Sequence, residues 1–339
     1  MRKANPKKTS FVPSQLSSTS TSLETIWMFD PRFFVSSQML IEVVYAECAF
    51  SAFVYLATVI LLFYIIKLKS VTSLWKDSPP LLMLFLSTFI LAVEHWKTVI
   101  VWIFVLAGLV AYPMDPVYTR IDQIASFWSK WFYDAATIGI FLQRVFLLLY
   151  PSRLILNRKI AFAIVVMEVL IPIVLVGVFQ GLNLMNGARK SGSGAQGLGR
   201  EGCYTLNCIF ENPKDHLLSK WLQLGMSVQI IIAGVLCQYM IYRYSRFLQS
   251  TISNNINRFT RFVFCFRIIL EMVPYTADVM CIFLLNKSVG LYIGDYITVG
   301  GSVDMLLCTI VYLKIARRHS GISSKNSKTR QCFTNTNHI

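Results

Sequence analysis

The stretch VVYAECAFSAFVYLATVILLFYIIK, residues 43–67, has no charged side chains except Glu47 and the closing Lys67. A helix rises about 1.5 Å per residue, so this stretch is long enough to cross a hydrocarbon core of about 30 Å. A helix also satisfies all of its backbone hydrogen bonds without help from water. We therefore predict a transmembrane helix here.

The rest of the chain repeats this pattern. Of its 339 residues, 55% are hydrophobic and only 14% are charged, which is too little charge to cover a soluble globule of this size. Further apolar runs lie near residues 80–106, 123–150, 160–179, 219–242, 261–285 and 290–314. The sequence thus predicts an all-α integral membrane protein, a bundle of seven transmembrane helices over residues 41–318.

Basic residues are divided unequally between the two sets of loops. The loops after the first, third and fifth runs, and the segment after the seventh, contain many lysines and arginines but one acid, Asp77. Positive loops are held in the cytoplasm, so the N-terminus is expected outside and the C-terminus inside. Topology and attraction to anionic membrane lipid explain this basic surface. No nucleic-acid module is recognisable, and no nucleic-acid partner is expected.

The two ends and one long loop are expected to lie outside the bundle. We expect residues 1–40 to be a disordered extracellular segment and residues 319–339 to be a cytoplasmic tail. Hydroxyls in the tail can accept phosphate and so permit arrestin-type docking, and an unstructured end is the alternative. Cys203 and Cys208 fall in an oxidising outside loop, where they either form a local disulfide or stay as two free thiols.

A second stretch, LQRVFLLLYPSR at residues 142–153, places Arg144 at the cytoplasmic end of the third run and Pro151 seven residues later. The sixth run contains the motif Met272-Val273-Pro274-Tyr275. In layout and in these motifs the chain resembles the nematode serpentine chemoreceptor superfamily of rhodopsin-like seven-transmembrane G protein-coupled receptors. The resemblance covers residues 40 to 318.

The chain also departs from the rhodopsin-like pattern. Gln143 and Val145 replace the acid and the tyrosine that usually flank the arginine, and Thr119 stands where a cysteine usually closes the outer end of the third helix. In the seventh run no proline separates Asp304 from Tyr312. These departures concern details of receptor switching and leave the predicted topology unchanged.

The resemblance implies a chemosensory receptor in the plasma membrane of sensory neuron cilia. Such a receptor binds a small environmental molecule and activates a heterotrimeric G protein. The resemblance also implies dimerisation of the receptor. A snorkelling anchor at the membrane surface is the alternative role for Arg144. The residues implied at the G protein interface are Gln143, Arg144, Val145, Pro151, Arg258 and Arg261, with Pro274 as the helix pivot.

Ionisable residues inside the runs point to a ligand site, because each is costly in lipid and should face the bundle interior. They are Glu47, Glu94, His95, Lys97, Lys130, Asp134, Glu168, Arg267, Glu271, Asp278 and Asp304. From their depths we expect one outer cavity for a small polar or ionic ligand, lined by Lys97, Ser126, Lys130, Trp131, Asp134, Tyr275 and Asp278. Alternatively, Lys130 with Asp134 and Glu94 with Lys97 pair one helical turn apart and merely hold the bundle together.

Other functional classes fit the sequence less well. His95 is the only histidine inside a run, so a metal site is not expected; nor is a cofactor or an enzymatic activity. An ion channel or a proton-coupled transporter is the main alternative, because buried acids and bases also line ion paths.

Overall fold

The computed structural model describes residues 37–68, 71–110, 116–151, 153–188, 213–244, 251–285 and 296–335. All regular secondary structure in these ranges is helical. Six helices are long and apolar enough to cross a membrane, at Ile41–Leu68, Pro79–Leu106, Ile121–Leu149, Ile155–Gly181, Trp221–Tyr244 and Tyr296–Lys314. The prediction of a helical membrane protein is therefore confirmed. Cys203 and Cys208 lie outside the described residues.

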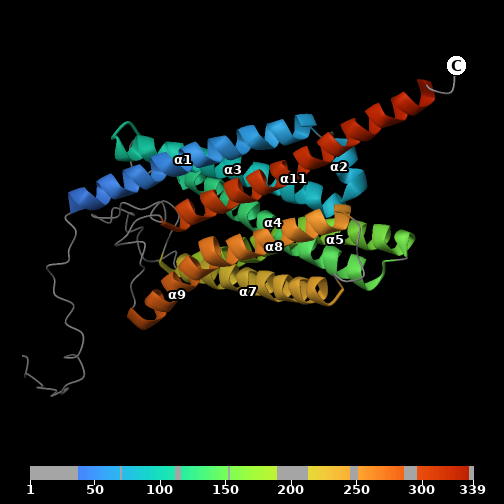
Figure 1. Cartoon of the computed structure of the whole chain (residues 1–339). Helices are drawn as coiled ribbons and strands as arrows, with labels where there is room; N and C mark the ends of the chain where they lie inside the picture. The colour runs from blue at the N-terminus through green and yellow to red at the C-terminus, as the bar shows by residue number, and fades with distance from the viewer. Residues whose placement is uncertain are drawn as a thin grey trace, which may run out of the picture. The chain divides into compact units, whose positions relative to one another are not determined.

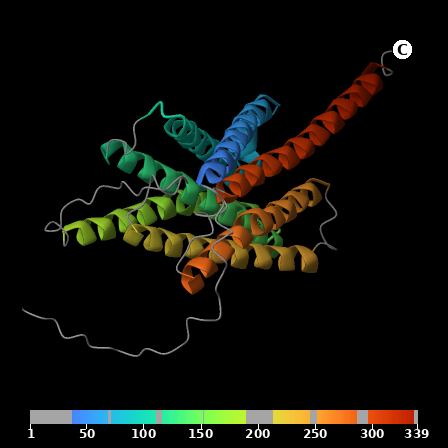
Figure 2. The same ribbon diagram turned by 90° about the vertical axis from the view of Figure 1, so that its left-hand side faces the viewer.

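Helix α4 (Pro116–Leu149) lies at the centre of the helix bundle. It packs against α3 (Pro79–Leu106) on one side and against α5 (Leu154–Ala188) and α7 (Pro213–Tyr244) on the other (Figures 1 and 2). In the most apolar window of α4, 72% of the residues are buried, against 28–44% in the other five apolar helices. Most residues in this window therefore contact protein on all sides.

Helix α1 (Ser37–Leu68) packs against both α3 and α11 (Tyr296–Asn335), as Figure 1 shows. The short helix α2 (Val71–Asp77) connects α1 to α3. Helix α11 continues past the apolar window that ends at Lys314 and remains helical to Asn335. At residues 319–335 the structure thus differs from the unstructured end that we considered.

The predicted span 261–285 is helical but is not one of the six long apolar helices. It consists of α8 (Thr251–Phe266), the π-helix η2 (Arg267–Met272) and α9 (Val273–Leu285). Arg267 and Glu271 in η2 are buried, and Asp278 in α9 is 1% exposed. The π-helix divides this segment into pieces of 16, 6 and 13 residues, and each piece alone is too short to cross a membrane.

The wide turn of η2 is explained by the proline that follows it. Pro274 has no N–H, so the carbonyl of Leu270, four residues earlier, loses its usual helical donor. The N–H of Val273 bonds to the carbonyl of Ile268, five residues back, as in a π-helix. The carbonyl oxygen of Leu270 faces Gly300 of α11, where a Cβ atom would lie closer to it than the 3.0 Å that real Cβ atoms keep. A glycine at position 300 therefore lets η2 pack directly on α11.

Candidate functional site

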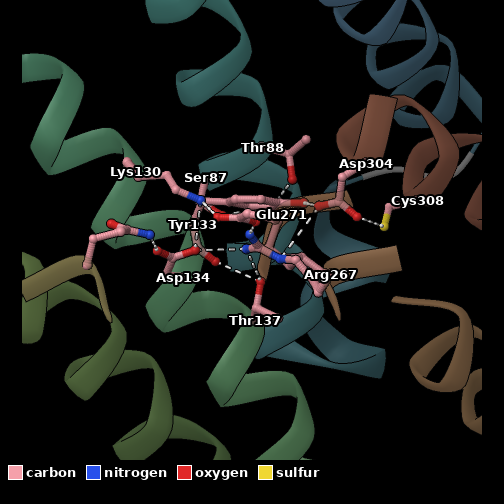
Figure 3. A network of polar contacts seen from close by, with 12 residues as sticks. Ser87, Thr88, Lys130, Tyr133, Asp134, Thr137, Arg267, Glu271, Asp304 and Cys308 are labelled. Atoms are coloured by element: carbon pink, nitrogen blue, oxygen red, sulfur yellow. Dashed lines mark hydrogen bonds and ion pairs between the residues drawn. The ribbon is translucent and has the colours of Figure 1, made fainter. Parts of the chain in front are cut away.

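A buried network of charges is centred on Arg267 of η2, whose side chain is 1% exposed (Figure 3). Its Nη2 atom lies 3.0 Å from Oδ1 of Asp134 in α4 and donates to Oγ1 of Thr137, one turn later, at 2.9 Å. Its Nε atom lies 3.6 Å from Oδ2 of Asp304 in α11. One arginine thus connects the π-helix to two other helices.

Lys130 and Glu271 form the more open end of the same network. Glu271 contacts both Arg267, one turn earlier in η2, and Lys130 of α4. The Nζ atom of Lys130 also lies 3.3 Å from Oδ1 of Asp134. The side chain of Lys130 is 23% exposed and that of Glu271 is 9% exposed, whereas Asp134 and Asp304 are fully buried. Lys130 is therefore the most exposed of these charged side chains.

Neutral polar groups complete the network. The guanidinium carbon of Arg267 lies 3.9 Å from the ring centroid of Tyr133, and the Tyr133 hydroxyl donates to Oδ2 of Asp304 at 3.1 Å. The Cys308 thiol donates to the other oxygen of Asp304 at 3.7 Å. Gln223 of α7 donates to Oδ2 of Asp134 at 3.0 Å. These contacts extend the network to a fourth element.

Three carboxylates meet two cations in this network, and direct contacts connect them all. Buried charges of this kind are tolerated only when they are paired and hydrogen-bonded. The set can hold its helices in one arrangement, and it can exchange an internal ion pair for a contact with a polar ligand. Among the described residues no group of three or more His, Cys, Asp or Glu side chains is suited to a metal ion.

Lys97 belongs to a separate charged group between α3 and α4. Its Nζ atom lies 2.7 Å from Oε1 of Glu94 and 2.6 Å from Oδ1 of Asp122. Thr98 donates to the other oxygen of Asp122 at 3.4 Å. The two pairings considered from the sequence, of Lys97 with Glu94 and of Lys130 with Asp134, both form. Each lysine also reaches a carboxylate that is not its one-turn neighbour.

The other residues expected in the cavity are Trp131, Tyr275, Asp278 and Ser126. Trp131 is fully buried in an apolar cluster with Ala135, Phe179 and Met226. Tyr275 and Asp278 are both buried in α9, and Asp278 lies within hydrogen-bonding reach of Tyr296 in α11. The hydroxyl of Ser126 is buried without a hydrogen-bond partner in the described part of the chain.

The residues expected at the cytoplasmic face are partly covered. Arg144 is 7% exposed, which contradicts the snorkelling role, because a snorkelling guanidinium would reach water. Gln143 is equally buried and accepts a hydrogen bond of 2.6 Å from Ser78, which precedes α3. Val145 is buried as well, whereas Pro151, Arg258 and Arg261 are exposed.

The expected ligand site omitted Arg267, Glu271 and Asp304, although all three stood out as ionisable residues in apolar runs. The four-residue spacing of Arg267 and Glu271 was a usable signal for their pairing, whereas Asp304 has no such neighbour. Pairing across helices requires the fold. No family model matches this chain, and a search of curated proteins finds no similar sequence.

Proposed function

We propose that this chain is a seven-helix chemosensory receptor that couples binding of a small polar molecule to activation of a heterotrimeric G protein. The observation that carries the proposal is the buried network around Arg267, which joins α4, η2 and α11. Lys130 gives this network a partly exposed end. The resemblance to serpentine chemoreceptors supports the same function.

In this proposal α8, η2 and α9 together form the sixth of seven transmembrane helices. Arg267 and Glu271 place charges inside this span, and their partners on α4 offset part of the cost of burying them in a membrane. The N-terminus is outside, the C-terminus is cytoplasmic, and the receptor belongs to the plasma membrane of sensory cilia. Cysteines introduced at Lys159 and at Arg258 should then react with a membrane-impermeant maleimide only in permeabilised cells.

The proposed mechanism starts at Lys130. An ionic or polar ligand competes with Glu271 for the lysine, or with the lysine for Glu271, and weakens the link between α4 and η2. The π-helix next to Pro274 then shifts relative to α11, and α8 moves with it. This movement uncovers Arg144 and its neighbours for the G protein. Binding favours the moved state only by its differential affinity for that state.

The decisive experiment measures nucleotide exchange on purified Gα subunits by the full chain in lipid nanodiscs. A panel of odorants first identifies an agonist by calcium imaging in cells that express the chain. Lys130→Ala should abolish or shift the agonist response at normal surface expression. The matched control Lys97→Ala, in the separate group with Glu94 and Asp122, should respond like the wild type. Equal responses of the wild type and Lys130→Ala would show that Lys130 is not part of the ligand site.

An ion channel or proton-coupled transporter is the second candidate function, because the same buried acids and bases could line an ion path. Measurements on the purified chain distinguish the receptor from the channel or transporter. Ligand-driven exchange on Gα, without flux through liposomes that contain the chain, supports the receptor. Flux or current without any G protein supports the channel or the transporter.

A further inference from the structure

Glu168 of α5 is a buried carboxyl group with no hydrogen-bond partner among the residues that the structure describes. Its side chain is 2% exposed, and neither Oε1 nor Oε2 has a hydrogen-bond partner in the described ranges. The other described carboxyl groups with buried side chains all have a polar contact, and they are Asp122, Asp134, Glu271, Asp278 and Asp304. Glu168 therefore differs from every other buried acid that the structure describes.

Gly139 of α4 provides the space that Glu168 occupies. A Cβ atom at position 139 would overlap Oε1 of Glu168 and would lie 2.7 Å from its Cδ atom. The same Cβ atom would lie 2.9 Å from Cγ2 of Ile164, one turn earlier in α5. The carboxyl group thus points from α5 into α4, at a position where α4 has no side chain.

The backbone at Glu168 has a second unusual feature. Pro172, four residues later inside α5, has no N–H to give to the carbonyl of Glu168. This residue therefore carries a side-chain carboxyl and a backbone carbonyl that both lack their ordinary donors. A carboxylate offers only further acceptors, whereas a protonated carboxyl adds one donor.

No cation among the described residues compensates a negative charge on Glu168. The charged groups on the elements packed against this interface are engaged elsewhere or lie toward the helix ends. On α4, Asp134 binds Arg267, and the Arg144 guanidinium lies near Cys237 of α7. Glu94 and Lys97 pair with each other on α3, and Lys130 belongs to the Arg267 network. Arg158 and Lys159 are exposed near the start of α5, and Arg243 lies near the end of α7.

We propose that Glu168 is a proton-binding site, a neutral carboxylic acid enclosed between α4 and α5 and distinct from the charge network at Arg267. An ionised carboxylate without a partner in a membrane interior is too costly to persist, so the group retains its proton. The packing of α5 against α4 at Gly139 then requires that Glu168 is protonated. A lipid-soluble carbodiimide, which reacts with protonated carboxyl groups, should therefore modify Glu168.

The labelling reaction balances without any further reactant. The carboxyl proton moves to one nitrogen of the carbodiimide, and the carboxylate oxygen adds to the central carbon to form an O-acylisourea. Transfer of the acyl group from this oxygen to nitrogen gives a stable N-acylurea. All atoms of both reactants remain in the product, whose added mass is found on the peptide that contains Glu168.

The first test is infrared difference spectroscopy of the full chain in lipid nanodiscs at neutral pH. Glu168→Gln keeps the size and neutrality of the side chain, so it should fold and should lose one carbonyl band of a protonated carboxyl group. The matched control is Asp134→Asn, which removes a buried carboxylate paired with Arg267 and should lose no such band. If Glu168→Gln leaves the protonated-carboxyl region unchanged, Glu168 is ionised and the proposal is wrong.

The second test uses the wild-type chain and so needs no variant to fold. Dicyclohexylcarbodiimide should label Glu168 more than Asp134 by about tenfold or more, because labelling follows the protonated fraction. Labelling of Asp134 or Asp304 in preference to Glu168 would overturn the proposal. Neither test involves a G protein or an agonist, so the result is independent of the receptor function proposed above.

Discussion

Replacement of Gly300 by alanine tests the contact between the π-helix and α11. The new Cβ atom would lie closer than 3.0 Å to the carbonyl oxygen of Leu270 and 3.3 Å from its carbonyl carbon. Both are backbone atoms, so rotation of a side chain cannot relieve the overlap, and α11 and η2 must move apart. Overpacking of this kind costs about 1–3 kcal/mol. Part of that loss is offset by the higher helix propensity of alanine, about 0.5–1 kcal/mol.

The neighbouring glycine provides the matched control. A Cβ atom at Gly301 would have no neighbour within 4 Å, so Gly301→Ala gains helix propensity without a clash. In thermal unfolding of the full chain in detergent, Gly300→Ala should lower the apparent midpoint by about 2–6 °C, and Gly301→Ala should leave it unchanged or slightly higher. If the two variants unfold at the same temperature, η2 does not pack on α11 through the Leu270 carbonyl. The agonist response of Gly300→Ala should change as well, because the clash lies at the proposed pivot.

Three further substitutions test other contacts. Arg267→Leu leaves three carboxylates with one lysine and should lower the stability of the folded protein by about 3–5 kcal/mol. The loss should appear as less folded monomer in size-exclusion chromatography, and a normal yield would contradict the network. In Gly234→Ala the new methyl group would overlap the Phe264 ring, which can rotate away. We expect the variant to be about 1 kcal/mol less stable than Gly225→Ala, whose methyl group meets no neighbour within 4 Å. Equal stabilities would exclude the α7–α8 contact. Ser78→Ala removes the donor to Gln143 and should cost about 1 kcal/mol in chemical unfolding, and no change would show that this bond contributes nothing.

The apolar helices were predictable because a membrane span needs a long run of apolar residues, and such runs are visible in a single sequence. The six spans of the structure begin and end within a few residues of predicted runs, apart from Ile155–Gly181 and Tyr296–Lys314, each of which begins five or six residues from its predicted start. The π-helix before Pro274 was not predicted. The proline indicated a kink, but the wide turn before it also needs room beside the Leu270 carbonyl, and that room comes from Gly300 of another helix.

The candidate site was predictable only in part. Helical spacing offered a pairing of Lys130 with Asp134 as the alternative to a ligand site, and their contact forms. The spacing could not show that Glu271 would reach the same lysine, or that Asp122 would draw Lys97 into another group, because both contacts depend on how two helices pack. Depth along each helix was therefore a poor guide to which residues share one site.

The linkage of α4 to η2 through Arg267 has a consequence for synthesis of the chain. Thr137 and Arg267, which are hydrogen-bonded in the folded protein, are 130 positions apart. At a translation rate of about 5–20 residues per second, α4 leaves the ribosome on the order of ten seconds before its arginine partner exists. During that interval Asp134 must be sheltered by the insertion machinery or stay protonated. A nascent chain that stops before η2 never receives its arginine, so Asp134 of such a fragment lacks the cation that it contacts in the folded protein.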